Sequence, residues 1–124
     1  MYVNTHGPLN KTANAQAMTL LARKMAELNT EKLPSILTAD FNIGPESANF
    51  APIRQNMKNA REAAPQTDEL DTYNGFGSGS GIIDHIWYNG FNALSYRTIR
   101  DTYLNVPYVS DHYPIVATLE VPLK

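Results

Sequence analysis

Three short segments of this chain place a carboxylate at the edge of a predicted strand. In chain order they are Thr38-Ala39-Asp40-Phe41-Asn42, Ile82-Ile83-Asp84-His85-Ile86 and Ser110-Asp111-His112-Tyr113-Pro114. Side chains from several strands converge at strand ends, where the backbone holds them in place. Asp40, Asn42 and Asp111 supply hard oxygen ligands, which suit Mg²⁺ or Mn²⁺ better than zinc.

Two histidines add donors to these carboxylates. His6 and His112 follow predicted strand ends and are able to donate to a phosphate or to developing negative charge. An adjacent carboxylate orients an imidazole and stabilises its protonated form, so we predict that Asp84 and His112 form a dyad. Taken singly, such residues more often cap turns or form structural hydrogen bonds. We interpret His85, between apolar neighbours at strand spacing, as structural or as part of the rim of the site.

The elements that must position these side chains are one clear helix and several strands. Apolar residues recur at spacings of three and four between residues 10 and 29, which predicts an amphipathic helix. Weaker helical segments are expected between residues 48 and 64, with an interruption at 56–59. The predicted strands are 2–5, 35–39, 82–88, 93–100 and 115–121. Asn89-Gly90 is typical of a hairpin turn and predicts a hairpin between the strands on either side of it.

Composition limits the class of protein further. A chain of 124 residues and 13.8 kDa has the size of one domain rather than two and is long enough to bury a core. Ten Lys and Arg against twelve Asp and Glu give a net charge of −2, which does not favour binding of long duplex nucleic acid. The absence of cysteine excludes a disulfide framework, a thiolate zinc site and a cysteine nucleophile. The sequence shows no signal-peptide pattern and no apolar run near the ~20 residues of a membrane span, and it does not predict a compartment.

Taken together and in this order, the segments resemble the C-terminal motifs of the endonuclease/exonuclease/phosphatase superfamily. These are metal-dependent phosphoesterases related to pancreatic deoxyribonuclease, exonuclease III, sphingomyelinase and inositol polyphosphate 5-phosphatases. Residues 4–6 resemble the N-T-H strand end of the family, and residues 39–42 its G-D-F-N motif. Residues 83–86 resemble I-D-[YH]-I, and residues 110–114 resemble S-D-H-x-P. Residues 72–76 are similar to the segment that precedes the I-D motif in bacterial members.

The resemblance implies a phosphoryl-transfer site with a divalent metal ion. Asp40 would orient the attacking water and help to deprotonate it. Asn42 would hold the phosphate or that water, and would share the metal with Asp40. Asp111 would be a ligand of the Mg²⁺ or Mn²⁺ ion, which acts as a Lewis acid.

The resemblance also implies roles around the phosphate. His112 would donate to a non-bridging phosphate oxygen, and Asp84 would determine which nitrogen of that ring carries the proton. His6 would contact the phosphate from the other side. These roles amount to positioning combined with electrostatic stabilisation.

The complete family fold is a four-layer α/β/β/α sandwich of two mixed sheets. This chain is expected to supply about half of it, as an α+β unit with a mixed, largely antiparallel sheet and helices on one face. The N-terminal half of the family, with the Glu that is a principal metal ligand, has no counterpart here, so residues 1–124 are predicted to be the C-terminal half of such a domain. Ala39 replaces the usual Gly, a mild change wherever φ is negative.

The expected function is therefore that of the C-terminal part of a Mg²⁺-dependent phosphoesterase, cleaving a phosphodiester or a phosphomonoester, and inactive as an isolated fragment. The alternatives are a non-catalytic binding domain that retains the scaffold and a small nuclease that completes its site across a dimer. The substrate stays open among nucleic acid, a phospholipid headgroup and a small phosphoester. A bare apolar sheet face would also favour a homodimer.

Overall fold

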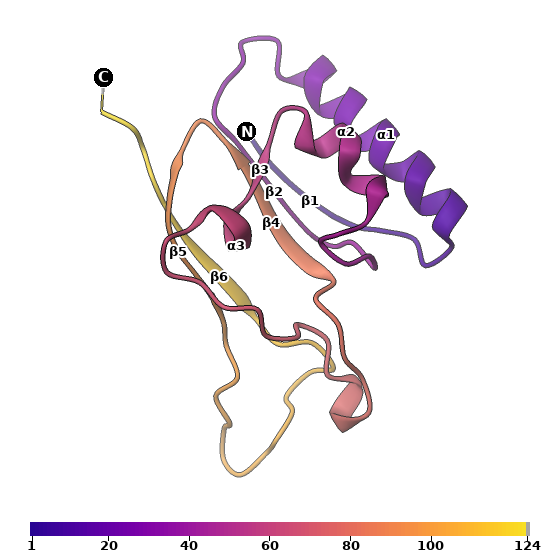
Figure 1. Ribbon diagram of the computed structural model, residues 1–124, viewed down its shortest axis with the longest axis vertical. Helices are drawn as coiled ribbons and strands as arrows, with labels where there is room; N and C mark the ends of the chain where they lie inside the picture. The colour runs from indigo at the N-terminus through magenta and orange to yellow at the C-terminus, as the bar shows by residue number, and fades with distance from the viewer. Residues whose placement is uncertain (124) are drawn as a thin grey trace.

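The computed structural model describes residues 1–123, and its elements follow the predicted order (Figure 1). The strands are β1 (Tyr2–His6), β2 (Ser35–Asp40), β3 (Lys58–Asn59), β4 (Asp84–Asn89), β5 (Asn92–Thr98) and β6 (Ile115–Glu120). The helices are α1 (Lys11–Leu28), α2 (Ala51–Arg54) and α3 (Ala60–Ala63), with 3₁₀ turns η1 (Ala48–Phe50) and η2 (Gly75–Gly77). The helix and the five strands predicted from the sequence are confirmed to within two residues at each end. The interruption predicted in the weaker helical region is the short strand β3.

The long helix α1 begins and ends as its sequence predicts. The side chain of Asn10 caps the first turn by accepting a hydrogen bond from Ala13 N at 3.0 Å. Met18 and Met25 are buried against the sheet, so the apolar stripe does face the core. The stripe does not extend to its predicted end, because Leu28 in the last turn is 74% exposed. No helix within residues 1–123 is long and apolar enough to cross a membrane.

A four-stranded sheet in the order β1-β2-β4-β3 forms the centre of the molecule. β1 and β2 run parallel, whereas β4 runs antiparallel to both β2 and β3. On one face, Leu37 and Trp87 pack in a core that includes Phe50 and Ile53. The helices α1 and α2 cover this face of the sheet (Figure 1). The fold class is therefore confirmed as α+β, with a mixed, largely antiparallel sheet and with α1 and α2 on one face.

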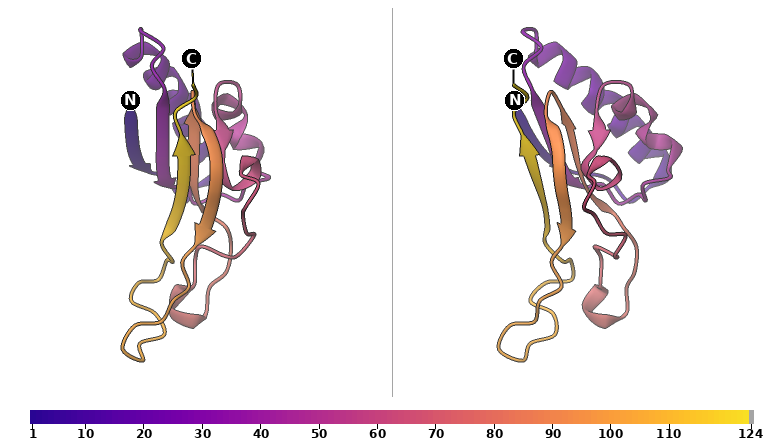
Figure 2. Two further views of the ribbon diagram at one scale, coloured as in Figure 1. Left: turned by 90° about the vertical axis from the view of Figure 1, so that its left-hand side faces the viewer. Right: turned by 60° about the vertical axis from the view of Figure 1, so that its left-hand side comes forward.

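β5 and β6 form a separate antiparallel hairpin on the other face of this sheet (Figure 2). Ile86 and Tyr88 of β4 pack with Tyr96 of β5 and with α3 in a second core. The hairpin predicted at Asn89-Gly90 is wrong, because β4 does not pair with β5. Both edges of β4 are already occupied by β2 and β3, so at Gly90 (φ 83°) the chain leaves this sheet and starts the second layer.

The bare apolar sheet face predicted from the sequence is smaller and more polar than expected. The β5–β6 hairpin covers the apolar part contributed by β4. In the uncovered part near β1, Tyr2 Oη is 2.9 Å from Thr38 Oγ1, and Asn4 Nδ2 donates to the same hydroxyl oxygen at 2.8 Å. Hydrogen-bonded side chains of this kind drive self-association less than an apolar surface does, and the homodimer stays a prediction.

Candidate active site

Three strand ends meet in one row at an edge of the four-stranded sheet. The register aligns His6, the last residue of β1, with Asp40, the last residue of β2. It also aligns Asp40 with Asp84, the first residue of β4. Because β4 runs antiparallel to β2, its beginning lies beside the end of β2. Neighbouring strands are roughly 4.8 Å apart, so side chains in such a row are within reach of one another.

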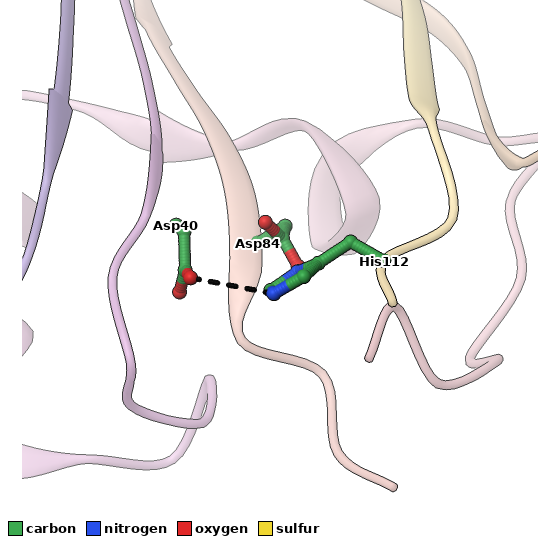
Figure 3. A group of neighbouring side chains, drawn as sticks. All are labelled: Asp40, Asp84 and His112. Atoms are coloured by element: carbon green, nitrogen blue, oxygen red, sulfur yellow. Dashed lines mark hydrogen bonds and ion pairs between the residues drawn. The ribbon is translucent and has the colours of Figure 1, made fainter. Parts of the chain in front are cut away.

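His112 reaches this row from the loop that precedes β6 (Figure 3). Its Nδ1 is 2.7 Å from Asp84 Oδ2, and its Nε2 is 3.5 Å from Asp40 Oδ2. His6 Nε2 lies 3.2 Å from the same Asp40 oxygen. Asp40, Asp84 and His112 each offer one ligand atom, and these atoms lie within 4.8 Å of one another. Four separate parts of the chain thus bring two carboxylates and two imidazoles together.

Burial and charge compete at the Asp84–His112 pair. Burial raises the pKa of the Asp84 carboxyl above its ordinary value, although hydrogen bonds from His112 and Thr72 act in the opposite direction. Burial also lowers the pKa of His112, but the hydrogen bond to Asp84 and the nearby carboxylate charges outweigh it, so the pKa of the ring is raised. The pair therefore holds a proton more tightly than the separate groups would. A protonated imidazole suits a group that donates to a phosphate oxygen.

A tight turn after β2 holds Asp40 and Asn42. Asn42 N donates to Asp40 Oδ1 at 2.9 Å, and Asn42 itself has a left-handed backbone with φ 55°, which asparagine tolerates better than most residues. Its side-chain nitrogen donates to Gly7 O at 2.7 Å, so the amide is tied to the loop after β1. Ala39 is not among the residues with positive φ, so the backbone accommodates an alanine in place of the Gly of the family.

The loop after β1 packs tightly against this turn. Gly7 N donates to Asp40 O at 2.7 Å, and a Cβ at Gly7 would lie 2.5 Å from Phe41 O, so no larger residue fits without a shift. Asn14 of α1 is fully buried and donates to Phe41 O at 2.8 Å and to Pro8 O at 3.0 Å. The helix therefore holds both loops at the edge where the side chains converge.

Asp111, predicted as a metal ligand, lies beside the group of Asp40, Asp84 and His112 but is not part of it. Its negative charge contributes to the raised pKa of His112, so it is near enough to act on that ring. Its backbone carbonyl accepts hydrogen bonds from the two amides of residues 74 and 75, at 2.8 and 3.1 Å. The structure therefore places Asp111 near His112 without bringing its carboxylate into the group.

Residues 72–74 support the site, a role that the sequence pattern did not indicate. Thr72 is fully buried, and its hydroxyl donates to Asp84 Oδ2 at 2.7 Å. Asn74 is also buried, and its backbone N–H donates to Asp111 O at 2.8 Å. The similarity of residues 72–76 to a family segment was the available signal. It did not reveal the contacts, because they join residues that are distant in the chain.

A cavity of about 370 Å³ lies at the other end of the sheet, where α1 ends. Met25, Ile53 and Met57 are among the side chains that line it, whereas Asp40, Asp84 and His112 do not. The carboxylate–histidine group therefore lies at the sheet edge and not in this cavity.

Comparison with known proteins adds a family match. The model of a family described as the Endonuclease/Exonuclease/phosphatase family matches residues 2–112 of the chain. No curated protein sequence matches it.

Solved structures match the whole fold. A family protein from Bacteroides thetaiotaomicron is 29% identical with a TM-score of 0.85, covering 98% of this chain and 50% of its own. A mannosyl-6-phosphatase from Bacteroides thetaiotaomicron VPI-5482 is 28% identical with a TM-score of 0.83, covering 94% of this chain and 49% of its own. A family protein from Bacteroides vulgatus is 26% identical with a TM-score of 0.79, and the match covers 94% of this chain and 48% of that protein. The chain thus spans about half the length of these structures.

Proposed function

This chain belongs to the endonuclease/exonuclease/phosphatase family, and we propose that it is the C-terminal half of a phosphoesterase domain that depends on Mg²⁺ or Mn²⁺. Its reaction is the attack of water on the phosphorus of a phosphodiester or a phosphomonoester. The observation that carries the proposal is the convergence of Asp40, Asp84 and His112 within 4.8 Å at one sheet edge (Figure 3).

The donor set at this edge fits a hard divalent cation. Carboxylate oxygens of Asp40 and Asp111 and the amide oxygen of Asn42 are ligands that Mg²⁺ and Mn²⁺ prefer. The two carboxylates of Asp40 and Asp84 lie in the same cluster, and a cation offsets such a concentration of negative charge. When bound, the ion supplies a Lewis acid that draws charge from a phosphoryl oxygen.

The chain's own residues orient the reactants and move the proton. Asp40 orients the water and accepts one of its protons while the new P–O bond forms and the ester P–O bond breaks. Protonated His112 donates from Nε2 to a non-bridging oxygen and is held through Nδ1 by Asp84. His6, 3.2 Å from Asp40, contacts the phosphate from the other side, and Asn42 holds the phosphate or the water. These are contributions of positioning and electrostatic stabilisation.

We further propose that the 124-residue chain is inactive alone. The solved structures that it matches are about twice as long. Loss of one supporting group at a metal site typically costs roughly 10–100-fold in affinity or activity, and loss of half the substrate contacts removes further transition-state stabilisation.

Metal binding by this chain is the first test. Paramagnetic Mn²⁺ added to the ¹⁵N-labelled chain should broaden the NMR signals of Asp40, Asp84 and His112 before those of other residues. Asp40→Asn should weaken this binding by roughly 10–100-fold. Asp101→Asn is the matched control, because Asp101 is an exposed carboxylate, 3.7 Å from Arg97, outside the cluster.

Turnover is the second test. A longer protein that contains this domain should hydrolyse a phosphoester with Mg²⁺, and 28% identity to a mannosyl-6-phosphatase makes mannose 6-phosphate the first substrate to try, beside bis-p-nitrophenyl phosphate. The isolated chain should hydrolyse neither. Uniform broadening by Mn²⁺ together with an inactive longer protein would favour a non-catalytic binding domain, and turnover by the chain alone would contradict the half-site.

A further inference from the structure

Thr72 occupies the centre of a hydrogen-bond network beneath the Asp84–His112 pair. Its side chain is fully buried. The hydroxyl donates to Asp84 Oδ2 at 2.7 Å and accepts from the backbone N–H groups of Ile83 at 3.0 Å and of Asp84 at 3.1 Å. Burial of a hydroxyl is favourable only when its hydrogen bonds are made, and here all of them are.

These partners determine the direction of the hydroxyl proton. A threonine hydroxyl has one proton and two acceptor lone pairs. Both lone pairs receive backbone N–H groups, so the proton has to point at Asp84 Oδ2. Asp84 is therefore held by a donor that cannot rotate away to another acceptor.

The same carboxylate oxygen receives His112. Asp84 Oδ2 lies 2.7 Å from Thr72 Oγ1 and 2.7 Å from His112 Nδ1. An ionised carboxylate has no proton to donate, so at this contact it accepts from a ring that carries its proton on Nδ1, and the Thr72 hydroxyl holds the carboxylate in the position that makes the contact. The other ring nitrogen, Nε2, is then directed at Asp40, at 3.5 Å.

The backbone of Thr72 also holds the segment that carries His112. Its carbonyl accepts from Tyr113 N at 2.8 Å, and its N–H donates to Gly81 O at 2.9 Å. The adjacent Tyr73 ring faces the His112 ring edge-on, with centroids 5.1 Å apart. Thr72 thus joins the beginning of β4 to the loop before β6 through both its side chain and its backbone.

We propose that Thr72 is a positioning residue that orients the Asp84 carboxylate and thereby keeps the proton of neutral His112 on Nδ1, with Nε2 facing the reaction centre. Its value for catalysis rests on the proposed phosphoesterase function, in which Nε2 is the nitrogen that takes up the second proton and donates it to the phosphate. The tautomer itself is a property of this chain in the absence of metal or substrate, so it is measured independently of that function.

The test is the tautomeric state of His112 in the ¹⁵N-histidine-labelled chain, read from the imidazole ¹⁵N shifts at alkaline pH, where the ring is neutral. Wild type should show His112 protonated on Nδ1. Thr72→Val preserves the shape but removes the hydroxyl, and should reduce the Nδ1-protonated form to less than half of the population. Thr72→Ser restores the donor and should restore the wild-type tautomer.

Thr98→Val is the matched control. Thr98 is also buried, and its hydroxyl donates to a carboxylate, Asp68 Oδ1, at 2.8 Å. Both valine variants lose one threonine–carboxylate hydrogen bond, so both should lose stability. Only Thr72→Val should change the tautomer of His112.

Two outcomes would overturn the proposal. One is a folded Thr72→Val chain whose His112 keeps the wild-type tautomer. The other is wild-type His112 protonated on Nε2, a result that needs no variant and so does not depend on whether Thr72→Val folds. Absence of Mn²⁺ binding, by contrast, would contradict the proposed function and leave the tautomer result unaffected.

Discussion

Asp84 and His85 are neighbours in β4, but they belong to two regions in which the pKa of a histidine is shifted in opposite directions. Asp84 lies at the sheet edge, where it pairs with His112, and His85 lies on the face that the helices cover. On the helix-covered face, His85 is 1% exposed, and its ring packs near those of Phe41 and Phe50, with centroids 5.7 and 5.2 Å away. Its Nε2 donates to Ile43 O at 2.9 Å. Burial lowers the pKa of His85 to about 4. At the sheet edge, carboxylates instead raise the pKa of His112.

The difference shows that burial alone lowers the pKa of an imidazole, whereas burial beside carboxylates can raise it. His85 stays neutral and contributes packing and one hydrogen bond to the core. His112 binds a proton readily because the charges of Asp84 and Asp40 offset the loss of solvent. The covered face buries apolar and aromatic side chains that stabilise the fold, whereas the sheet edge concentrates charge.

The largest expected effect is loss of stability from the covered face. Phe50 is fully buried, and its ring centroid lies 4.9 Å from that of Trp87. Phe50→Ala should lower the free energy of unfolding by about 3–5 kcal/mol, from lost transfer energy and the cavity left behind. Urea denaturation measures this change. Phe76→Ala is the control, because Phe76 is 65% exposed and should change stability by no more than about 0.5 kcal/mol.

The next effect depends on pH and comes from His85. Its folded-state pKa of about 4 lies below its unfolded value of roughly 6.5. Well above pH 6.5, His85 is neutral in both the folded and the unfolded state, and its titration does not affect stability. As the pH falls to 4, His85 takes up a proton in the unfolded state first, so the free energy of unfolding falls by about 3 kcal/mol. His85→Phe removes this titration. Relative to the variant, wild type should therefore lose about 3 kcal/mol between about pH 7.5 and pH 4 in denaturant melts.

Groups that do not interact with His85 contribute equally to wild type and variant, so they cancel in the difference between the two. Glu62 does not cancel fully, because a charged His85 makes a small contribution to the lowered pKa of that carboxyl. A difference that does not change with pH would mean that the buried ring accepts a proton without cost, and the contrast between the two regions would not hold.

The smallest effect on stability should come from the sheet edge itself. Asp40→Asn preserves the shape of the side chain and the acceptor for Asn42 N, while it removes a charge from a cluster that contains Asp84. Its free energy of unfolding should change by less than about 1 kcal/mol, although Mn²⁺ binding should fall roughly 10–100-fold. A large loss of stability with metal binding unchanged would make Asp40 a structural residue.

Much of the fold was predictable because its signals are local. The 3.6-residue periodicity of α1 and the alternating strands appear in the sequence without knowledge of any contact. The Asn89-Gly90 hairpin failed because a local turn preference carries no information on whether the edges of β4 are free. The apolar face is smaller than predicted for a related reason, since nothing local indicates that the β5–β6 hairpin folds over Ile86 and Tyr88.

The sequence by itself determined the chemistry of the candidate site. The residue types of Asp40, Asp84, Asp111 and His112 follow from the order of amino acids and from a family resemblance that the family match supports, as do the places of Asp40 and Asp84 at strand ends. Only the tertiary structure decided the geometry. The register of three strands puts His6, Asp40 and Asp84 in one row, and the contact of Thr72 with Asp84 joins residues 12 apart across a loop. Distances of this kind result from packing the whole chain at once, and no short stretch of sequence encodes them.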